Sequence, residues 1–195
     1  GGDGRLNASE DSSVTISGTT SGAEDDQTVS LNISSSSGGT PINTTASVSS
    51  NSYSVTGLDL SSLSDGTLTI TADVDDLAGN SATQATDSTT KDTASPTISV
   101  AINDGGDGRL NASEDSSVTI SGSTSGAEDG QTVSIAISDG TNTVNTTATV
   151  DSNAYSVTDL DLSSLDDGTL SITADVDDLA GNSATQVTDS TTKDS

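Results

Sequence analysis

Residues 96–122 read PTISVAINDGGDGRLNASEDSSVTISG, and the signal for β-structure is most readable there. Apolar and polar side chains alternate on both sides of a Gly/Asp-rich stretch. A period of two is typical of strands that bury one face, whereas Gly and Asp mark turns. The segment therefore predicts a strand over Pro96–Ile102, a loop over Asn103–Glu114 and a second strand over Ser117–Ser121. The residues expected to face inward are Ile98, Val100, Ile102, Val118 and Ile120.

The second half of this segment occurs twice in the chain. GGDGRLNASEDSSVTISG fills Gly1–Gly18 and Gly105–Gly122, and TADVDDLAGNSATQ fills Thr71–Gln84 and Thr173–Gln186. A repeat of roughly 100 residues has the size of a whole small domain. We therefore expect two domains, 1–91 and 92–195, of which the first lacks the initial strand. Because both ends of the sequence fall inside the repeat, it is expected to be a piece of a longer array.

The same alternation continues through the second copy. It predicts further strands at Thr132–Ile137, within Thr143–Val150, at Tyr155–Asp159 and at Thr169–Val176, and a last strand whose first residues are Ser183–Thr188. Leu160–Gly168, which joins the strand at Tyr155–Asp159 to the strand at Thr169–Val176, is expected to form a corner with a helical turn. Seven short strands at regular spacing favour an all-β fold made of two tandem immunoglobulin-like β-sandwich domains. The short linker Lys91–Pro96 favours domains arranged end to end as a stiff rod, with a plain tether as the alternative.

Composition limits the partners of this chain. Four basic residues face 30 acidic ones, which gives a net charge of −26, and there is no Cys and no His. A polyanion is a poor partner for nucleic acid or an anionic membrane surface. Without thiolate or imidazole, the remaining ligands are carboxylate, amide and backbone oxygens, which suit calcium. No apolar run is long enough to span a bilayer, so membrane insertion is not expected. With 28% hydrophobic residues and 1% aromatic ones, we expect bound cations to add stability.

The loop Asn103–Glu114 resembles a twelve-position calcium loop. Counting from Asn103, a Gly stands at the tight-turn position, and oxygen ligands stand at several of the ligand positions. The candidate ligands are Asn103, Asp104, Asp107, the Arg109 carbonyl, Asn111 and Glu114. Asp104 is included because Gly105 stands at a ligand position. The first copy keeps a weaker set, Asp3, Asn7 and Glu10. The alternative is a Gly/Asp-rich turn with solvated carboxylates.

Two further acidic groups are candidate calcium sites. The turn that follows the sixth strand carries Asp75 and Asp76 in the first copy and Asp177 and Asp178 in the second. Adjacent carboxylates favour a nearby cation, although solvent-facing side chains and an Asx-type turn explain them equally well. The third group combines Asp92 in the linker with acidic residues expected at the facing poles, including Asp129. Calcium could bridge these poles, or they could simply be solvated.

Enzyme signatures are missing from the sequence. A His-based triad and a Cys nucleophile cannot be built, and no phosphate-binding loop is present. Paired carboxylates could act on glycosides, but the chain offers almost no aromatic platform for a sugar. Lys91 and Lys193 are read as linker residues and as poor candidates for an isopeptide crosslink. We therefore expect a protein that is not an enzyme.

Four motifs together resemble the bacterial Ig-like repeats of giant surface adhesins, the RTX and biofilm-associated proteins of Gram-negative bacteria. They are KDTASPTISV (Lys91–Val100), GDGRLNASE, SLDDGTL (Ser164–Leu170) and DDLAGNSAT (Asp177–Thr185). Tyr53 and Tyr155 stand where that family often has Trp. The resemblance implies a calcium-binding extender that stacks on neighbouring repeats and projects a distal ligand-binding region. It also implies a monomeric protein, exported by type I secretion to the extracellular bacterial surface.

Two other functions compete with this interpretation. The chain could be an adhesive module whose Ser/Thr-rich faces, or the hairpin Gly38–Ile42, contact a glycan, ice or another cell directly. The acidity could instead be a general adaptation to high salt, in which case potassium chloride would stabilise the protein as well as calcium does.

Overall fold

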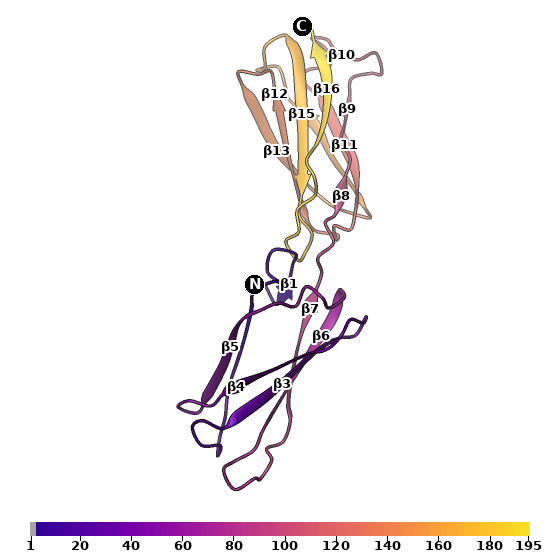
Figure 1. Cartoon of the computed structure of the whole chain (residues 1–195). Helices are drawn as coiled ribbons and strands as arrows, with labels where there is room; N and C mark the ends of the chain where they lie inside the picture. The colour runs from indigo at the N-terminus through magenta and orange to yellow at the C-terminus, as the bar shows by residue number, and fades with distance from the viewer. Residues whose placement is uncertain (1–2) are drawn as a thin grey trace. The chain divides into compact units, whose positions relative to one another are not determined.

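The computed structural model describes residues 3–195, which form strands and turns without any helix (Figure 1). The chain divides into two compact units, Gly1–Thr93 and Ala94–Ser195. The division therefore falls just after the one expected from the repeat. Among the described residues, no apolar helix of membrane-spanning length occurs.

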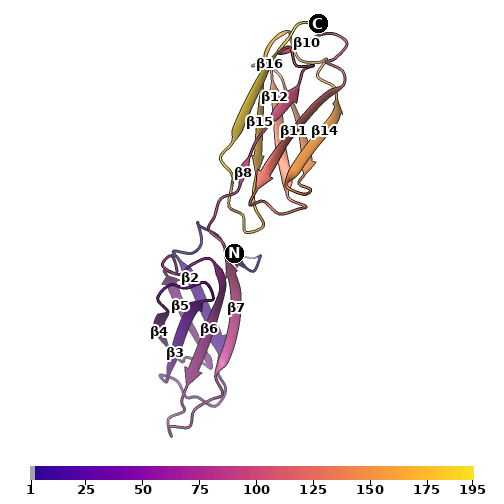
Figure 2. The ribbon, with the colours of Figure 1, turned by 90° about the vertical axis from the view of Figure 1, so that its right-hand side faces the viewer.

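Unit 2 is a sandwich of two sheets. The larger sheet has the order β10 (Arg109–Leu110), β16 (Val187–Lys193), β15 (Gly168–Val176), β12 (Thr132–Ser138) and β13 (Thr143–Thr149). In the smaller sheet, β11 (Val118–Ser125) lies between β14 (Ala154–Leu160) on one side and both β8 (Thr97–Ile98) and β9 (Ala101–Asn103) on the other (Figure 2). The strand pairs are antiparallel except β10 with β16, which is parallel. This is the predicted all-β, immunoglobulin-like architecture.

Unit 1 repeats the larger sheet and simplifies the smaller one. Its five-stranded sheet has the order β1 (Arg5–Leu6), β7 (Ala85–Lys91), β6 (Gly66–Val74), β3 (Thr28–Ser35) and β4 (Ile42–Ser47). The second sheet consists of β2 (Val14–Thr19) and β5 (Ser52–Leu58). Within residues 3–93, no strand pairs with the outer edge of β2, the edge that β8 and β9 cover on β11 in unit 2.

Several predicted boundaries were wrong. The first predicted strand is split into β8 and β9, although Ser99 N donates to Ser123 O and keeps both pieces in one register. The last strand begins at Val187 because the chain first closes a turn and joins β15 only through isolated contacts. The expected helical turn after β14 is a single turn closed by Leu165 N donating to Leu162 O. Leu162 and Leu165 are both buried there, so the corner closes one end of the core.

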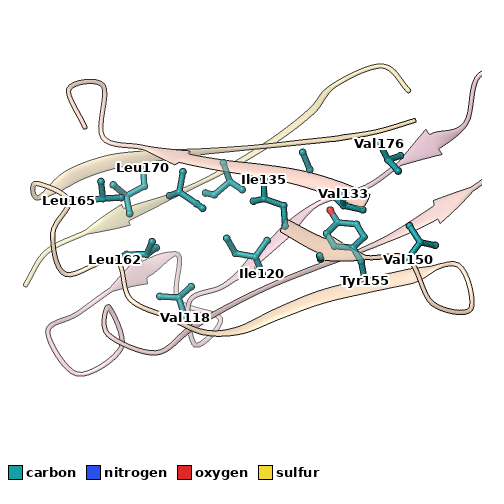
Figure 3. Packing of buried hydrophobic residues seen from close by; sticks show 14 of the residues in the cluster. Val118, Ile120, Val133, Ile135, Val150, Tyr155, Leu162, Leu165, Leu170 and Val176 are labelled. Carbon is teal, nitrogen blue, oxygen red and sulfur yellow. The ribbon is translucent and has the colours of Figure 1, made fainter. Parts of the chain in front are cut away.

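The core of unit 2 lies between its two sheets (Figure 3). Burial follows the period of two: β12 buries Val133, Ile135 and Ile137 between exposed or half-buried neighbours. The side chains of β8 and β9 and the residues between them also pack on this core, through Ile98, Val100 and Ile102. The inward face predicted from alternation is confirmed for these strands.

Raising the pH above 10 should destabilise unit 2. Tyr155 is buried between the sheets, its hydroxyl donates to Ser99 O at 2.6 Å, and burial raises the pKa of Tyr155 to about 12. Because the unfolded chain loses this proton near pH 10 and the folded unit keeps it until about pH 12, stability is full below pH 10 and falls between these values. Thermal melting at a series of pH values checks this. A Tyr155→Phe variant with the same alkaline loss would contradict it.

Candidate functional site

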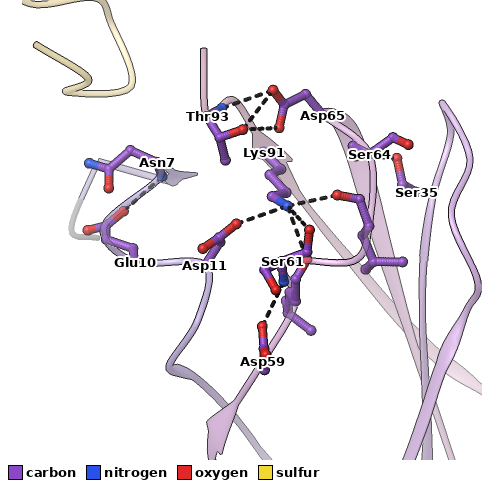
Figure 4. Close-up of polar contacts among 12 residues, drawn as sticks. Asn7, Glu10, Asp11, Ser35, Asp59, Ser61, Ser64, Asp65, Lys91 and Thr93 are labelled. Atoms are coloured by element: carbon purple, nitrogen blue, oxygen red, sulfur yellow. Dashed lines mark hydrogen bonds and ion pairs between the residues drawn. The ribbon is translucent and has the colours of Figure 1, made fainter. Parts of the chain in front are cut away.

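A buried ion pair lies at the end of β7 in unit 1. Lys91 Nζ lies 3.0 Å from Asp11 Oδ2, and the exposed fractions of the two side chains are 2% and 10%. The ammonium also donates to Leu60 O at 3.1 Å, Ser61 O at 3.3 Å and Leu63 O at 2.7 Å (Figure 4). Lys91 therefore ties the last strand to the corner after β5 and to the loop after β1.

Unit 2 carries the same arrangement. Lys193 Nζ lies 3.2 Å from Asp115 Oδ2 and 3.6 Å from Asp167 Oδ1, and it donates to Leu165 O at 3.0 Å. The expectation that Lys91 and Lys193 are linker residues was wrong: each ends a strand and is buried. Oxygen acceptors surround each Nζ, so each lysine holds the last strand of its unit to neighbouring loops. We call Lys91 and Lys193 structural pins, because each joins the last strand of its unit to neighbouring loops through a buried Nζ.

The predicted ligands at the start of the Asn103–Glu114 loop hold local turns. Asn103 Oδ1 accepts from Gly105 N at 3.3 Å, and Asp107 Oδ1 accepts from Arg109 N at 3.0 Å. Asp104 accepts from Gly106 N at 3.1 Å and from the Thr191 hydroxyl at 3.0 Å. The hydrogen bond from Gly106 N has the largest effect, and together with the bond from Thr191 it holds the pKa of the Asp104 carboxyl below its usual value. The carboxylates of Asp104 and Asp107 therefore already serve as acceptors for the backbone.

The end of the same loop forms a reciprocal cap. Asn111 Oδ1 accepts from Ser113 N at 2.9 Å, and Glu114 Oε2 accepts from Asn111 N at 3.0 Å. Glu114 Oε1 lies 2.9 Å from the point where a Cβ on Gly105 would stand, so the glycine makes room for this carboxylate. Arg109 pairs with Thr192 in the β10–β16 ladder. The loop thus brings Glu114 back towards its own beginning.

Unit 1 repeats these bonds. Asp3 Oδ1 accepts from Arg5 N at 3.0 Å, Asn7 Oδ1 accepts from Ser9 N at 2.9 Å, and Glu10 Oε2 accepts from Asn7 N at 3.3 Å. The backbone N–H of Asp92 donates to Leu6 O at 2.9 Å, which continues the pairing beyond β1 and β7.

The acidic turns after β6 and β15 form Asx-type loops. Asp76 accepts from both nitrogens of Asn80, and these bonds hold the pKa of the Asp76 carboxyl below its usual value. Asp178 accepts from both nitrogens of Asn182 at 2.8 and 2.9 Å. The neighbouring Asp75 and Asp177 are exposed and sit in isolated bridges with Ser81 and Ser183. The Asx-turn interpretation describes Asp76 and Asp178.

Carboxylates also join neighbouring turns in ways that the sequence did not indicate. Glu128 Oε2 accepts from Leu179 N at 2.8 Å, and Glu24 accepts from Leu77 N in unit 1 at 2.8 Å. Asp129 Oδ1, a predicted ligand, accepts from Ser152 N at 2.7 Å. The partners lie far apart in the sequence, and only the identical placement of the acid in both copies could have pointed to this role.

Among residues 3–195, no three Asp or Glu side chains gather into a group that could hold a metal ion. The predicted ligands have the oxygen chemistry that calcium requires, but the loops spread them over separate turns. The described loops therefore offer the ligand type that calcium uses, without three carboxylates close together.

Neither a family model nor a curated protein matches the sequence. Solved structures that are similar to this chain include three of bacterial or large adhesion proteins. One is from work on the host cell surface retention of a 1.5-MDa bacterial ice-binding adhesin; it shares 29% identity with a TM-score of 0.58, over 100% of this chain and 62% of the other. Another, a Ca²⁺-stabilised adhesin with which an Antarctic bacterium binds ice, shares 29% with a TM-score of 0.53, over 97% and 46%.

The third structure is a tetra-tandem repeat in the extending region of a large adhesion protein, with 31% identity and a TM-score of 0.49, over 97% of this chain and 48% of that one. The chain thus spans less than two thirds of each of these three structures. It is a tandem pair of β-sandwich units similar to solved parts of large bacterial adhesins. The resemblance noted from the sequence motifs is confirmed.

Proposed function

We propose that this chain is a structural extender of a bacterial surface adhesin. The observation that carries the proposal is the repetition itself: two sandwich units are built on one plan, each pinned by a buried lysine, and they are joined without a Gly/Ser spacer. The similar adhesin structures support it. An extender gains length from each added copy, whereas a catalytic or binding site gains little from this plan. The expected location is the outer surface of the cell, and the expected partners are neighbouring repeats of the same monomeric chain.

Calcium is part of this proposal. The similarity to an adhesin described as Ca²⁺-stabilised supports it, together with the acidic loops of this chain. The residues that would hold calcium in unit 2 are Asp104, Asp107 and Glu114 with the amide oxygens of Asn103 and Asn111. Bound there, calcium would neutralise part of the charge of −26 and stiffen the loop. Asp92, Asp129 and the acidic turns after β6 and β15 are the proposed ligands near the ends of the units.

Adding calcium is expected to raise the melting temperature. A ligand at a hundredfold excess over its Kd adds about 2.7 kcal/mol of stability, or about 10 °C for a domain of this size. The measurement is thermal melting monitored by circular dichroism, after chelation and then with calcium chloride or with potassium chloride at matched ionic strength. Equal stabilisation by both salts would indicate general screening and would contradict the calcium proposal.

A matched pair of variants locates the effect. The double variant Asp107→Asn/Glu114→Gln keeps hydrogen-bond acceptors in the loop and removes two charges, and we expect it to lose most of the calcium-induced shift of unit 2. Asp161→Asn is the control, because Asp161 accepts from Ser163 N at 2.9 Å in an exposed turn outside the proposed ligand set. The readout is the shift caused by calcium rather than the melting temperature itself, since Glu114 also caps the loop.

A further inference from the structure

The two ends of unit 2 are linked through one pair of parallel strands. β8, the first strand of the unit, lies at one end of it, and β16 ends at the other (Figure 1). β10 and β16 are parallel, with Arg109 opposite Thr192 and Leu110 opposite Lys193. A pull on the two ends of the unit therefore slides residues 102–110 along the axis of β16 and does not peel them away from it.

Hydrogen bonds join residues 102–110 to β16 and its C-terminal extension along their whole length. They run from Ile102 N to Asp189 Oδ2 at 3.0 Å, from the Thr191 hydroxyl to Asp104 Oδ2 at 3.0 Å, from Thr192 N to Gly108 O at 3.3 Å and from Asp194 N to Leu110 O at 2.9 Å. A slide along the strand axis loads these bonds together, whereas a peel would break them one after another. The arrangement therefore resists a pull along the strands more than a pull across them.

The lysine pin reinforces this pair of strands where β16 ends. Lys193 Nζ lies 3.2 Å from Asp115 Oδ2, and the exposed fractions of the two side chains are 4% and 8%. Asp115 lies in the loop that follows β10, so the ion pair links the last strand directly to that loop. Sliding β16 separates two charges that are shielded from water, and leaving either charge buried without its partner is strongly unfavourable.

Unit 1 has the same arrangement. β1 and β7 are parallel, and Asp92 N donates to Leu6 O at 2.9 Å beyond the last residue of β7. Lys91 Nζ lies 3.0 Å from Asp11 Oδ2 in the loop after β1. The parallel strands and the buried ion pair are therefore part of the plan on which both units are built.

We propose that β10, β16 and the Lys193–Asp115 ion pair form a mechanical clamp, which resists force applied along the chain. The clamp controls the rate at which unit 2 unfolds under force, because its contacts are loaded before those between β12 and β13. The proposal rests on the proposed extender function only for the source of the force, since a spacer on a cell surface carries the load between the cell and its target. Failure of the clamp would leave the extender function standing, because a spacer can be long without resisting force.

The first test changes the direction of the force and keeps the fold. Because the chain has no Cys, introduced cysteines are unique handles for single-molecule force spectroscopy of the whole chain. Ser95→Cys with a Cys added after Ser195 loads unit 2 from end to end. Thr141→Cys with the same added Cys pulls across the strands, because the β12–β13 hairpin meets the corner beside Lys193 through the bond from Asp166 N to Asp139 Oδ2 at 2.8 Å.

The end-to-end pull should give the higher mean unfolding force at the same loading rate. Equal forces in the two directions, or a higher force across the strands, would overturn the proposal. This comparison uses the parent clamp and needs no variant of Lys193.

The second test compares two substitutions in the end-to-end chain. Lys193→Met should make unit 2 unfold about a hundredfold faster at the same force, because the ion pair is broken in the transition state. Ile135→Ala is the control: Ile135 is 2% exposed in β12, outside the clamp, and its truncation should lower the stability in urea by a comparable amount. Its unfolding rate under force should change by less than about threefold. Equal acceleration by both substitutions would mean that Lys193 contributes only general stability, and would overturn the proposal.

Discussion

Replacing Lys193 with Met is expected to lower the free energy of unfolding of unit 2 by about 3 kcal/mol. The substitution leaves the Asp115 carboxylate buried, with 8% of its side chain exposed, without the ammonium that lies 3.2 Å away. It also removes the donor for Leu165 O at the corner. Urea unfolding measures the effect. In a Tyr53→Phe background, Tyr155 is the sole tyrosine, and its fluorescence follows unit 2 alone.

Controls separate the loss of charge pairing from the loss of packing. Lys91→Met should weaken unit 1 by a similar amount, because Lys91 faces Asp11 and three carbonyls. The double variant Lys193→Met/Asp115→Leu removes both charges and should recover part of the loss. If the free energy of unfolding of the Lys193→Met variant lay within about 0.5 kcal/mol of that of the parent chain, the ion pair would not contribute to the stability of unit 2 as proposed.

The second large effect is expected in β11, which shares the sequence VTISG with β2 of unit 1. Ile120→Ala should cost unit 2 about 3 kcal/mol, because Ile120 is 0% exposed under β9 and its loss leaves a cavity. The identical change in unit 1, Ile16→Ala, should cost about 1 kcal/mol, since Ile16 is already half-buried. Urea unfolding followed by the single tyrosine of each unit gives both values.

A variant with a second copy of residues 94–104 fused ahead of Gly1 provides the matched control. There Ile16 lies under an added strand, and the cost of Ile16→Ala should rise towards that of Ile120→Ala. Equal costs for the two substitutions in the original chain would mean that β8 and β9 contribute nothing to the burial of Ile120, and would contradict the description of the core.

The alternation of apolar residues was enough to predict the strands that fill the core. Val133, Ile135 and Ile137 alternate without interruption and are all buried. The two-residue strands β1 and β10 could not be predicted, because a parallel pairing such as Leu110 with Lys193 joins segments far apart in the sequence and needs no local pattern. Between β8 and β9, Ser99 O lies close to Gly122 and accepts from the Tyr155 hydroxyl, and no local pattern indicates these contacts.

The candidate site was predictable in its residue types and not in its arrangement. The spacing of acids in the Asn103–Glu114 loop indicates oxygen ligands, yet Asp107 serves the N–H of Arg109 and Glu114 serves that of Asn111. Whether carboxylates converge is decided by the packing of loops, which spacing along the chain does not define. Lys91 and Lys193 follow the same STT triplet, and that repeated strand ending was the available signal for their burial.

The most direct test of the extender proposal is small-angle X-ray scattering of the whole chain with calcium and after chelation. A calcium-stiffened pair of units predicts a larger maximum dimension and a narrower distance distribution with calcium, together with a higher melting temperature. Scattering profiles and melting temperatures that do not change on chelation would contradict the account.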